Sequence, residues 1–333
     1  MERLPHAEQL RRLSRLAESA LGHYALPAGA ILSLVNVSEN ATYRVDAGGR
    51  RYALRVHREG YHARPAIASE LAWAIALRAD GAAMTPVPVA GRDGGLIQTV
   101  HHEHLPRPRD VVLFEWEDGV EPSETEHDLT APFEILGEIA ARMHRHAMGW
   151  RRPPDFERHR WDFATSIGER PHWGRWRDGM GMTPDRIGLI GRTVDLIGQR
   201  LARFGQGDHR FGLVHCDMRL ANLLIDGDVT KVIDFDDCGF SWYLYDCATT
   251  VSFFEHRPEV PRLLAAWVRG YRRVKELPAE DEREIWTFVM LRRILLVAWI
   301  GSHAETNLAR SMGAVDYTAS TIPLCEDYLR HFA

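Results

Sequence analysis

The sequence predicts an α+β protein in which a small β-rich region precedes a larger, mainly helical region. Two observations carry this prediction. Before about residue 120, short β-prone runs are separated by glycine-containing turns, and one helical stretch interrupts them. After that point, apolar side chains recur at helical spacing. With 333 residues, of which 45% are hydrophobic, the chain is long enough for two lobes and a sizeable core.

The β-prone runs of the first region are expected to pair into one sheet. They comprise residues 31–35, 42–45, 51–56, 96–100 and 111–115, with turns at 46–49 and 92–95. A helix is expected between the third and fourth runs, with Pro65 in its first turn. Its apolar face would consist of Ile67, Leu71, Ala74, Ile75 and Leu77.

The second region shows helical periodicity over most of its length. One apolar face would consist of Leu136, Ile139, Ala140 and Met143, and another of Ile187, Ile190, Val194, Ile197 and Leu201. Thr183 and Pro184 mark the start of the second of these helices. Further helices are expected near residues 261–276, 280–303 and 313–332.

The segment HCDMRLANLLIDGDVTKVIDFDD, residues 215–237, carries the chemistry. Two short apolar runs are joined by an Asp-Gly-Asp turn, which predicts a hairpin with Asn222 and Asp234 side by side at its open end. These side chains offer the hard oxygen ligands that magnesium prefers. Asp217, on the loop just before the hairpin, can accept a proton from an attacking hydroxyl. This spacing of oxygen-bearing side chains suits phosphoryl transfer.

This segment resembles the catalytic and metal loops of the protein-kinase-like phosphotransferases, specifically the group of aminoglycoside phosphotransferases, choline kinases and homoserine kinases. The resemblance covers about residues 31–246 and is specific only in the catalytic and metal loops. It implies a bilobal protein-kinase-like fold, with a nucleotide-binding lobe of antiparallel strands and one helix at residues 1–118 and a catalytic and acceptor-binding lobe at 119–333. It also implies ATP and Mg²⁺, with Asp217 as the catalytic base, Asn222 and Asp234 as metal ligands, and His215 as a structural prop.

In the first lobe, two segments resemble the family's nucleotide contacts. Residues 37–45 resemble its phosphate-covering loop, in which Ser38 and Asn40 would stand where protein kinases use glycines. An Asn-containing turn is the simpler alternative. Residues 112–119 resemble the hinge between the lobes, where backbone groups near Glu115 and Trp116 would hydrogen-bond adenine.

Arg55 occupies the position at which protein kinases carry a phosphate-binding lysine, and part of the family similarly has arginine there. The chain has 41 lysine and arginine residues, and only Lys231 and Lys275 are lysines. We expect Arg55 to pair with Glu70, the alternative being two solvated surface charges. Arg219 is a second cation that would reach the γ-phosphate, unless it only braces the loop.

Two acidic residues after Asp234 also matter. Asp236 is expected to face the metals or the acceptor, because alternate residues share a side, the alternative being a solvated run of charges. Asp246 resembles the family's aspartate that braces the catalytic segment, so its expected role is structural.

Chain-level quantities restrict the partners and the location. A net charge of -5 and a pI near 6.4 argue against nucleic acid or a polybasic membrane contact. The charged start lacks the apolar core of a signal peptide, so a cytoplasmic location is expected. Four cysteines without metal-type spacing are expected to be reduced thiols.

Three functions compete. The leading one is an ATP-dependent kinase for a hydroxyl of a small molecule, such as a metabolite, an amino alcohol or an aminoglycoside-like antibiotic. The second is a serine/threonine protein kinase of the bacterial stress-response type, although Asp246 follows Asp234 too closely for a long activation segment. The third, prompted by Arg55, is an inactive nucleotide-binding scaffold.

Aromatic residues near carboxylates in the second lobe favour a cationic acceptor, although such residues more often belong to a core. The candidates are Trp161, Asp162, Trp242, Tyr243, Glu255, Trp299 and His303. The oligomeric state is left open by the sequence.

Overall fold

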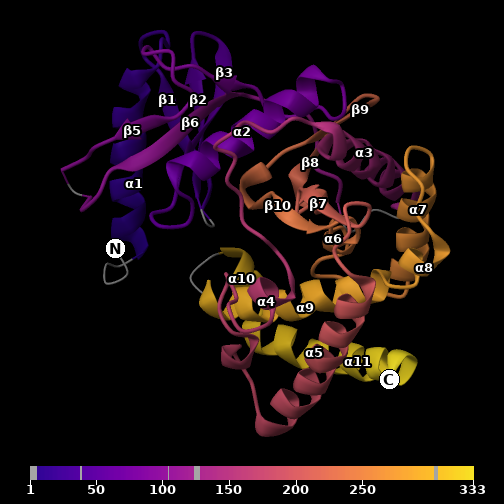
Figure 1. Ribbon diagram of the computed structural model, residues 1–333. Coiled ribbons are helices and arrows are strands. Elements are labelled where there is room, and N and C mark those ends of the chain that lie inside the picture. The colour runs from indigo at the N-terminus through magenta and orange to yellow at the C-terminus, as the bar shows by residue number, and fades with distance from the viewer. Residues whose placement is uncertain (1–5, 38–39, 104, 124–127, 304–306) are drawn as a thin grey trace.

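The computed structural model describes residues 6–37, 40–103, 105–123, 128–303 and 307–333. Most strands lie in the first third of the chain and most helices in the remainder, so the predicted α+β class is confirmed. Figure 1 shows the large sheet at one end of the molecule, the short strand pairs in the middle, and α5, α9 and α11 at the other end.

The N-terminal sheet has six strands in the order β1-β2-β3-β6-β4, and β5 also pairs with β6. All of these pairs are antiparallel. The strands are β1 (Ile31–Val37), β2 (Ala41–Ala47), β3 (Arg50–Val56), β4 (Pro88–Val89), β5 (Gln98–Val100) and β6 (Arg109–Glu115). Every expected run therefore forms a strand, and only the two-residue β4 escaped prediction.

Two helices pack against this sheet. In α2 (Arg64–Ala79), Pro65 lies in the first turn as expected. The predicted face of α2 is buried except for Ile75, which is 40% exposed, so that assignment was wrong. The helix also buries Ala66, Ser69, Trp73 and Glu70, and the charge of Glu70 is paired inside the site described below. The helix α1 (His6–Ala20), beside the sheet in Figure 1, was missed, although Leu10, Leu13 and Leu16 recur at helical spacing.

Two short strand pairs carry the central loops. Strand β7 (Phe211–Val214) pairs with β10 (Gly239–Trp242), and β8 (Leu223–Asp226) pairs with β9 (Val229–Val232). The turn of the second pair contains Gly227, whose φ of +57° lies in the region that glycine adopts without strain. The predicted hairpin is confirmed.

The remaining chain is mainly helical, as expected. The principal helices are α3 (Thr130–Gly149), α5 (Pro184–Phe204), α6 (Tyr243–Thr249), α7 (Val260–Arg272), α8 (Ala279–Glu282), α9 (Ile285–Ser302) and α11 (Ala314–Phe332), with short α4 (Phe163–Ser166) and α10 (Asn307–Met312). The single helix expected at 280–303 is divided into α8 and α9. Helix α5 begins as predicted, because the Thr183 side chain accepts a hydrogen bond from the backbone N–H of Arg186.

Helices α3 and α7 touch through their backbones. A Cβ atom added at Gly137 would lie 1.9 Å from the carbonyl oxygen of Trp267, and one added at Gly270 would lie 1.8 Å from that of Glu134. Only glycine fits at both positions, so this reciprocal pair sets how closely the two helices approach.

The stretch from Ala279 to Ser302 is long and apolar enough to cross a membrane, and an 18-residue window within it has a mean hydropathy of 1.5. In the fold, however, 83% of it is buried against other elements, which is typical of a core helix. The cytoplasmic location stays a prediction.

The segment that follows β6 is fastened to the hairpin of β8 and β9. Val120 and Ile225 exchange two backbone hydrogen bonds of 2.9 Å. Lys231, on β9, donates to the carbonyl oxygen of Asp118 at 2.8 Å and pairs with Glu117 at 3.2 Å. The chain is thus already attached to the second region by residue 120. A lobe boundary near residue 118 stays a prediction that these contacts favour.

Candidate active site

One buried carboxylate accepts hydrogen bonds from the backbone of the loop that follows β7. Asp246, on α6, accepts hydrogen bonds from the backbone N–H groups of His215 (3.1 Å) and Cys216 (2.7 Å). It also accepts one from His144 Nε2 at 2.9 Å. Cys216 has a φ of +68°, an uncommon conformation for a residue with a side chain, which these bonds stabilise. The expected bracing role of Asp246 is therefore confirmed.

His215 connects this loop to the next strand. Its Nδ1 accepts a hydrogen bond from the backbone N–H of Asp217 at 3.2 Å, so its hydrogen lies on Nε2. That Nε2 donates to the carbonyl oxygen of Ile233 at 3.1 Å. The imidazole thus ties the residue before Asp234 to Asp217, and the prediction that it props the loop is confirmed.

Asp217, Arg219 and Asn222 lie together, as the sequence predicts. The Nε of Arg219 is 3.2 and 3.1 Å from the two carboxylate oxygens of Asp217. The Nδ2 of Asn222 donates to the carboxylate of Asp217 at 2.7 Å and to its carbonyl oxygen at 2.8 Å. Because Arg219 contacts Asp217 directly, its bracing role is visible in the structure, and a reach toward phosphate stays a prediction.

Arg292, from α9, is a further member of this network that sequence reasoning missed. Its Nη2 donates to Asp217 Oδ1, and its Nε donates to Ser252 at 3.2 Å. Its side chain is 3% exposed. The available signal was a pair of charged residues in the middle of an apolar helix, which require buried partners.

Opposing effects act on the ionisation of Asp217. Burial of the carboxyl group would raise its pKa, but the positive charges of Arg219 and Arg292 outweigh burial and lower it. Asp217 is therefore a carboxylate at neutral pH, able to accept hydrogen bonds.

Asp234 lies where β9 ends and adopts a left-handed conformation with a φ of +62°. Its position opposite Asn222 follows from the hairpin register, because the N–H of Ile233 donates to the carbonyl oxygen of Asn222 at 2.9 Å. Half of its side chain is exposed, and its Oδ1 lies 3.9 Å from Arg55. Desolvation by the surrounding protein raises the pKa of Asp234 despite the opposing charge of Arg55.

Asp236 lies deeper than Asp234. Its Oδ1 is 4.0 Å from Arg55 and 3.8 Å from His57, and its Oδ2 is 3.9 Å from His62. Burial lowers the pKa of His62 to about 2 and that of His57 well below its usual value, so neither ring is positively charged at neutral pH. Burial raises the pKa of Asp236 to about 7, and among the described residues its Oδ1 has no hydrogen-bond partner. The alternative of a solvated run of charges is thus wrong for Asp236.

Arg55 and Glu70 form the predicted pair, with 2.5 Å between Nη2 and Oε1. Their side chains are 8% and 3% exposed, so the alternative of two solvated surface charges is wrong. Burial tends to lower the pKa of Arg55, but the charges of Glu70, Asp236 and Asp234 raise it overall. Arg55 is thus a permanent cation between the helix of the sheet region and the carboxylates that follow β9.

The structure describes three of the four other residues that were expected to contact nucleotide in the first lobe. Ser38 lies outside the described residues. Asn40 is buried and accepts a hydrogen bond from the N–H of Arg58 at 3.0 Å. The N–H groups of Glu115 and Trp116 donate to the carbonyl oxygens of Val87 (2.8 Å) and Arg51 (3.3 Å). These two N–H groups already have acceptors in the sheet region, so the contact with adenine, which stays a prediction, would use other backbone groups near them.

Asp237, which follows Asp236, contacts an aromatic group. Tyr61, from the loop before α2, donates its hydroxyl hydrogen to Asp237 Oδ1. Trp173 in turn donates to the hydroxyl oxygen of Tyr61 at 3.1 Å. The guanidinium carbon of Arg292 lies 5.5 Å from the Trp173 ring centre. Trp173 therefore connects the surroundings of Asp217 with those of Asp237.

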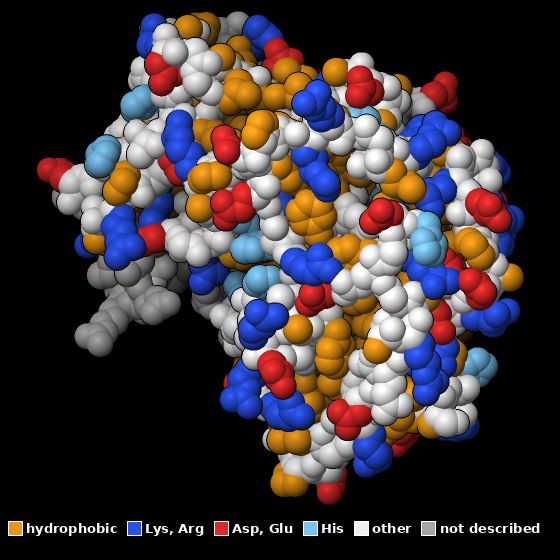
Figure 2. Space-filling view, in the orientation of Figure 1, with side chains coloured by type: hydrophobic (Ala, Val, Ile, Leu, Met, Phe, Trp, Pro, Cys, Tyr) orange, Lys and Arg blue, Asp and Glu red, His pale blue; other side chains and the backbone are white. Residues whose placement is uncertain are grey.

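Histidines border this group. The rings of His62 and His159 are 4.7 Å apart and those of His159 and His172 are 4.5 Å apart. Figure 2 shows histidine side chains gathered near the junction of the two regions, and acidic and basic side chains interspersed over the rest of this face. Neither Tyr61 nor Trp173 was singled out from the sequence.

The residues expected to face an acceptor divide into two sets. Several have structural partners instead: Asp162 caps α4, Trp242 donates to Gly205, Tyr243 donates to Asp208, and Glu255 pairs with Arg293. The rings of Trp161 and Trp299 lie 4.9 and 6.3 Å from that of Trp173, and His303 stacks on Trp299 at 5.1 Å. Only this second set lies beside the site.

The donor set suits a divalent cation. Asn222, Asp234 and Asp236 offer oxygen atoms of the kind that Mg²⁺ prefers, and no residue in the described ranges hydrogen-bonds the buried Oδ1 of Asp236. His62, Asp236 and Asp237 also bring ligand atoms within 4.8 Å of one another. The structure thus brings together the predicted base Asp217, candidate metal ligands and the cation Arg55.

Comparison with known proteins is consistent with this geometry. A family model described as "Phosphotransferase enzyme family" matches residues 32–285. A solved microcompartment-associated aminopropanol kinase is 44% identical, with a TM-score of 0.88, and the match covers 96% of this chain and 98% of that one. The comparison with curated protein sequences gave no match.

Two more distant structures share the fold. An amicoumacin kinase solved with AMP-PNP, Ca²⁺ and its antibiotic is 20% identical, with a TM-score of 0.77 and coverage of 97% of this chain and 96% of that one. A choline kinase from Cryptosporidium parvum Iowa II is 12% identical, with a TM-score of 0.61 and coverage of 96% of both chains. At these identities, the likeness concerns the fold alone.

Proposed function

The chain belongs to the phosphotransferase enzyme family, and from this premise we propose that its acceptor is a small amino alcohol. The coarser activity is that of an ATP-dependent kinase, which moves the γ-phosphoryl group of ATP to a hydroxyl group of a small molecule. The acceptor and the roles of individual residues are the proposal.

Asp217 is the proposed catalytic base. Its lowered pKa keeps it ionised, so it orients the acceptor hydroxyl and accepts its hydrogen as the new bond to phosphorus forms. Arg292 and Asn222 hold the carboxylate in place from two sides. Arg219 lies beside the same carboxylate and offers positive charge to the transferring group.

The nucleotide phosphates are assigned to the side of the site where Arg55 meets the acidic residues after β9. Glu70 fixes the guanidinium of Arg55, whose planar fork suits phosphate oxygens. Asn222, Asp234 and Asp236 would hold Mg²⁺, which neutralises phosphate charge when bound. Because the Nδ2 of Asn222 is engaged by Asp217, its amide oxygen remains as the ligand atom.

The observation that carries the acceptor proposal is the 44% identity, over 96% of the chain, with an aminopropanol kinase. The geometry adds support. Asp237 and the aromatic rings of Tyr61 and Trp173 lie beside the Asp217 network, and a carboxylate next to aromatic faces is a suitable site for an ammonium group. An amino alcohol whose ammonium group binds Asp237 would present its hydroxyl group to the base Asp217.

A matched pair of acceptors tests the proposal. 1-Amino-2-propanol and 1,2-propanediol differ in one group, an ammonium against a hydroxyl. With ATP and Mg²⁺, we expect kcat/KM for the amine to exceed that for the diol about 10–100-fold, the range of one charge-assisted hydrogen bond. Asp237→Asn should reduce this preference while leaving ATP-dependent stabilisation of the fold intact.

A generic protein substrate and an aminoglycoside complete the panel. Equal rates for amine and diol would refute the amino alcohol proposal. Phosphate found on protein and on no small hydroxyl would favour a protein kinase instead. ATP binding without turnover on any acceptor, unchanged by Asp217→Ala, would point to the inactive scaffold.

A further inference from the structure

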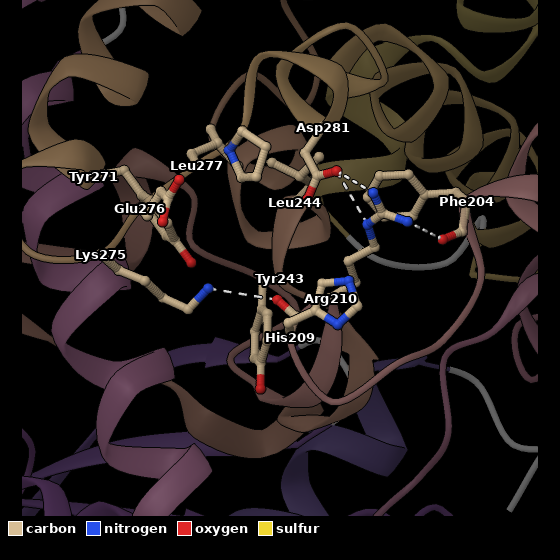
Figure 3. A pocket seen from close by; sticks show the side chains of 11 residues that line it. Phe204, His209, Arg210, Tyr243, Leu244, Tyr271, Lys275, Glu276, Leu277 and Asp281 are labelled. Carbon is tan, nitrogen blue, oxygen red and sulfur yellow. Dashed lines mark hydrogen bonds and ion pairs between the residues drawn. The ribbon is translucent and has the colours of Figure 1, made fainter.

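A pocket of about 380 Å³ lies beside α6 and α7, and none of the proposed catalytic, nucleotide or metal residues lines it. Its walls include Tyr243, Tyr271, Arg210 and Asp281, and Lys275 extends across it toward the backbone of His209 (Figure 3). Arg210 and Asp281 pair with each other at 2.7 Å, so these two charges compensate one another. Lys275 is the remaining cation of the wall.

Lys275 has weak partners. Its Nζ lies 5.1 Å from the ring centre of Tyr243 and 5.8 Å from that of Tyr271. It reaches the carbonyl oxygen of His209 only at 3.5 Å, and within the described part of the chain it forms no ion pair with a carboxylate. Burial lowers the pKa of Lys275, since the charges of Asp281 and Glu276 do not compensate for it. More of this amine is therefore in the neutral, nucleophilic form at a given pH.

The only other lysine provides the contrast. Lys231 contacts the carboxylates of Glu117 (3.2 Å) and Asp226 (3.3 Å) and the carbonyl oxygen of Asp118. Burial would lower the pKa of Lys231, but these partners raise it overall. In a chain whose other basic side chains are arginine and histidine, the two lysines thus have opposite environments.

The wall of the pocket is connected to the catalytic loop. Tyr271 donates its hydroxyl hydrogen to His144 Nδ1 at 3.1 Å, and His144 Nε2 donates to Asp246 at 2.9 Å. Asp246 in turn holds the N–H groups of His215 and Cys216. Removing the charge of Lys275 would end its attraction to the Tyr271 ring, at the outer end of this chain of hydrogen bonds.

We propose that Lys275 is a regulatory modification site, acylated by small acyl phosphates that enter this pocket, and that its acylation lowers kinase activity. In the reaction, the neutral amine attacks the acyl carbon and a C–N amide bond forms. The C–O bond to phosphate breaks, phosphate leaves with the electron pair, and the nitrogen releases one proton to solvent. The product is a neutral amide, which no longer binds the aromatic faces as a cation.

Acetyl phosphate is the probe and is applied to the full chain at about pH 8. At this pH the rate of acetylation depends on the neutral fraction of each amine. Peptide mapping by mass spectrometry then follows Lys275 and Lys231 separately, and the N-terminal amine as well. We expect Lys275 to be acetylated about tenfold faster than Lys231, and the difference to vanish in urea, since unfolding removes both environments. Equal rates in the folded chain would overturn the site.

Activity is read as ADP formation, with and without acceptor. Treatment with acetyl phosphate should lower the rate of ADP formation about fivefold in the parent chain and in Lys231→Arg, a change typical of coupled sites. The rate in Lys275→Arg should not change. Selective acetylation with unchanged ADP formation would overturn the regulatory role. Because neither the mapping nor acceptor-free ADP formation needs an amino alcohol, these readouts are independent of the proposed acceptor.

Discussion

At the scale of single residues, the site combines a local pattern with one distant contribution. Asp217, Arg219 and Asn222 are close in sequence, and their spacing alone predicted that they meet. Arg292 is 75 residues away from Asp217, and no local pattern specifies that contact. Long-range pairs of this kind depend on how helices pack, which one sequence does not reveal.

Arg292→Met should change the pH dependence of catalysis. Loss of this charge raises the pKa of Asp217, so the acid limb of the kcat/KM profile should move to higher pH. A looser carboxylate should also lower kcat on the order of 100-fold. Because its pKa is lowered on folding, ionised Asp217 adds to the free energy of unfolding above its ordinary pKa, and acidification removes this contribution. In Arg292→Met the contribution should be lost at a higher pH than in the parent chain.

The neighbouring Arg293 is the matched control for this variant. It is equally buried but pairs with Glu255 instead of Asp217. Arg293→Met should therefore reduce stability without moving the acid limb. A common shift in both variants would show that general loosening of α9, and not the charge beside Asp217, is responsible.

At the scale of elements, α6 supports the catalytic loop through Asp246. Asp246→Ala should lower the free energy of unfolding by about 3–5 kcal/mol, because two backbone N–H groups and His144 lose a buried charged acceptor. Asp327→Ala, which removes an exposed ion pair with Arg330 on α11, should change it by less than about 0.5 kcal/mol. Urea denaturation of both variants measures the difference, and similar midpoints would contradict it.

The contact between α3 and α7 gives a second prediction at this scale. Gly137→Ala should destabilise the fold by about 1–3 kcal/mol or more, because the added methyl group collides with the carbonyl of Trp267. In contrast, Gly188→Ala in α5, where nothing lies within 4 Å, should stabilise it by about 0.5–1 kcal/mol. Thermal unfolding of the two variants should therefore move in opposite directions. A shift in the same direction would mean that helix propensity outweighs the contact.

Element prediction succeeded where the pattern was strong and local. The hairpin of β8 and β9 followed from two apolar runs around a turn, and α5 from its cap and periodic face. Helix α1 was missed although its pattern is of the same kind, with Leu16, Ala17 and Ala20 buried on one face. At the hinge, the strand neighbours Val87 and Arg51 take the N–H groups of Glu115 and Trp116, and this pairing is visible only in the assembled sheet.

At the scale of the whole molecule, the fold class was predictable because strands and helices separate along the chain. The residues on the acceptor side were not predictable, since Tyr61, Trp173 and Asp237 come from three distant segments. Their meeting depends on how the loop before α2 lies against the helical region. Specificity is thus the part of the function least accessible to sequence reasoning.

Nucleotide should stabilise the whole molecule in a metal-dependent way. At 100 times Kd, ATP with Mg²⁺ should add about 2.7 kcal/mol to the free energy of unfolding, as linkage requires. A chelator or Asp234→Ala should remove most of this gain, because the proposed metal ligand is lost. Differential scanning fluorimetry checks it. An undiminished ATP effect in Asp234→Ala would exclude Asp234 from metal binding.

The attachment of residues 117–120 to the β8 and β9 hairpin has a mechanical consequence. The strands are short and stiff, and their far end carries Asn222 and Asp234. A displacement of the sheet region would therefore act on those two side chains through the contacts of Val120 and Lys231. If Asn222 and Asp234 hold the proposed metal ion, then releasing ADP and weakening the coordination of that ion would occur in the same movement.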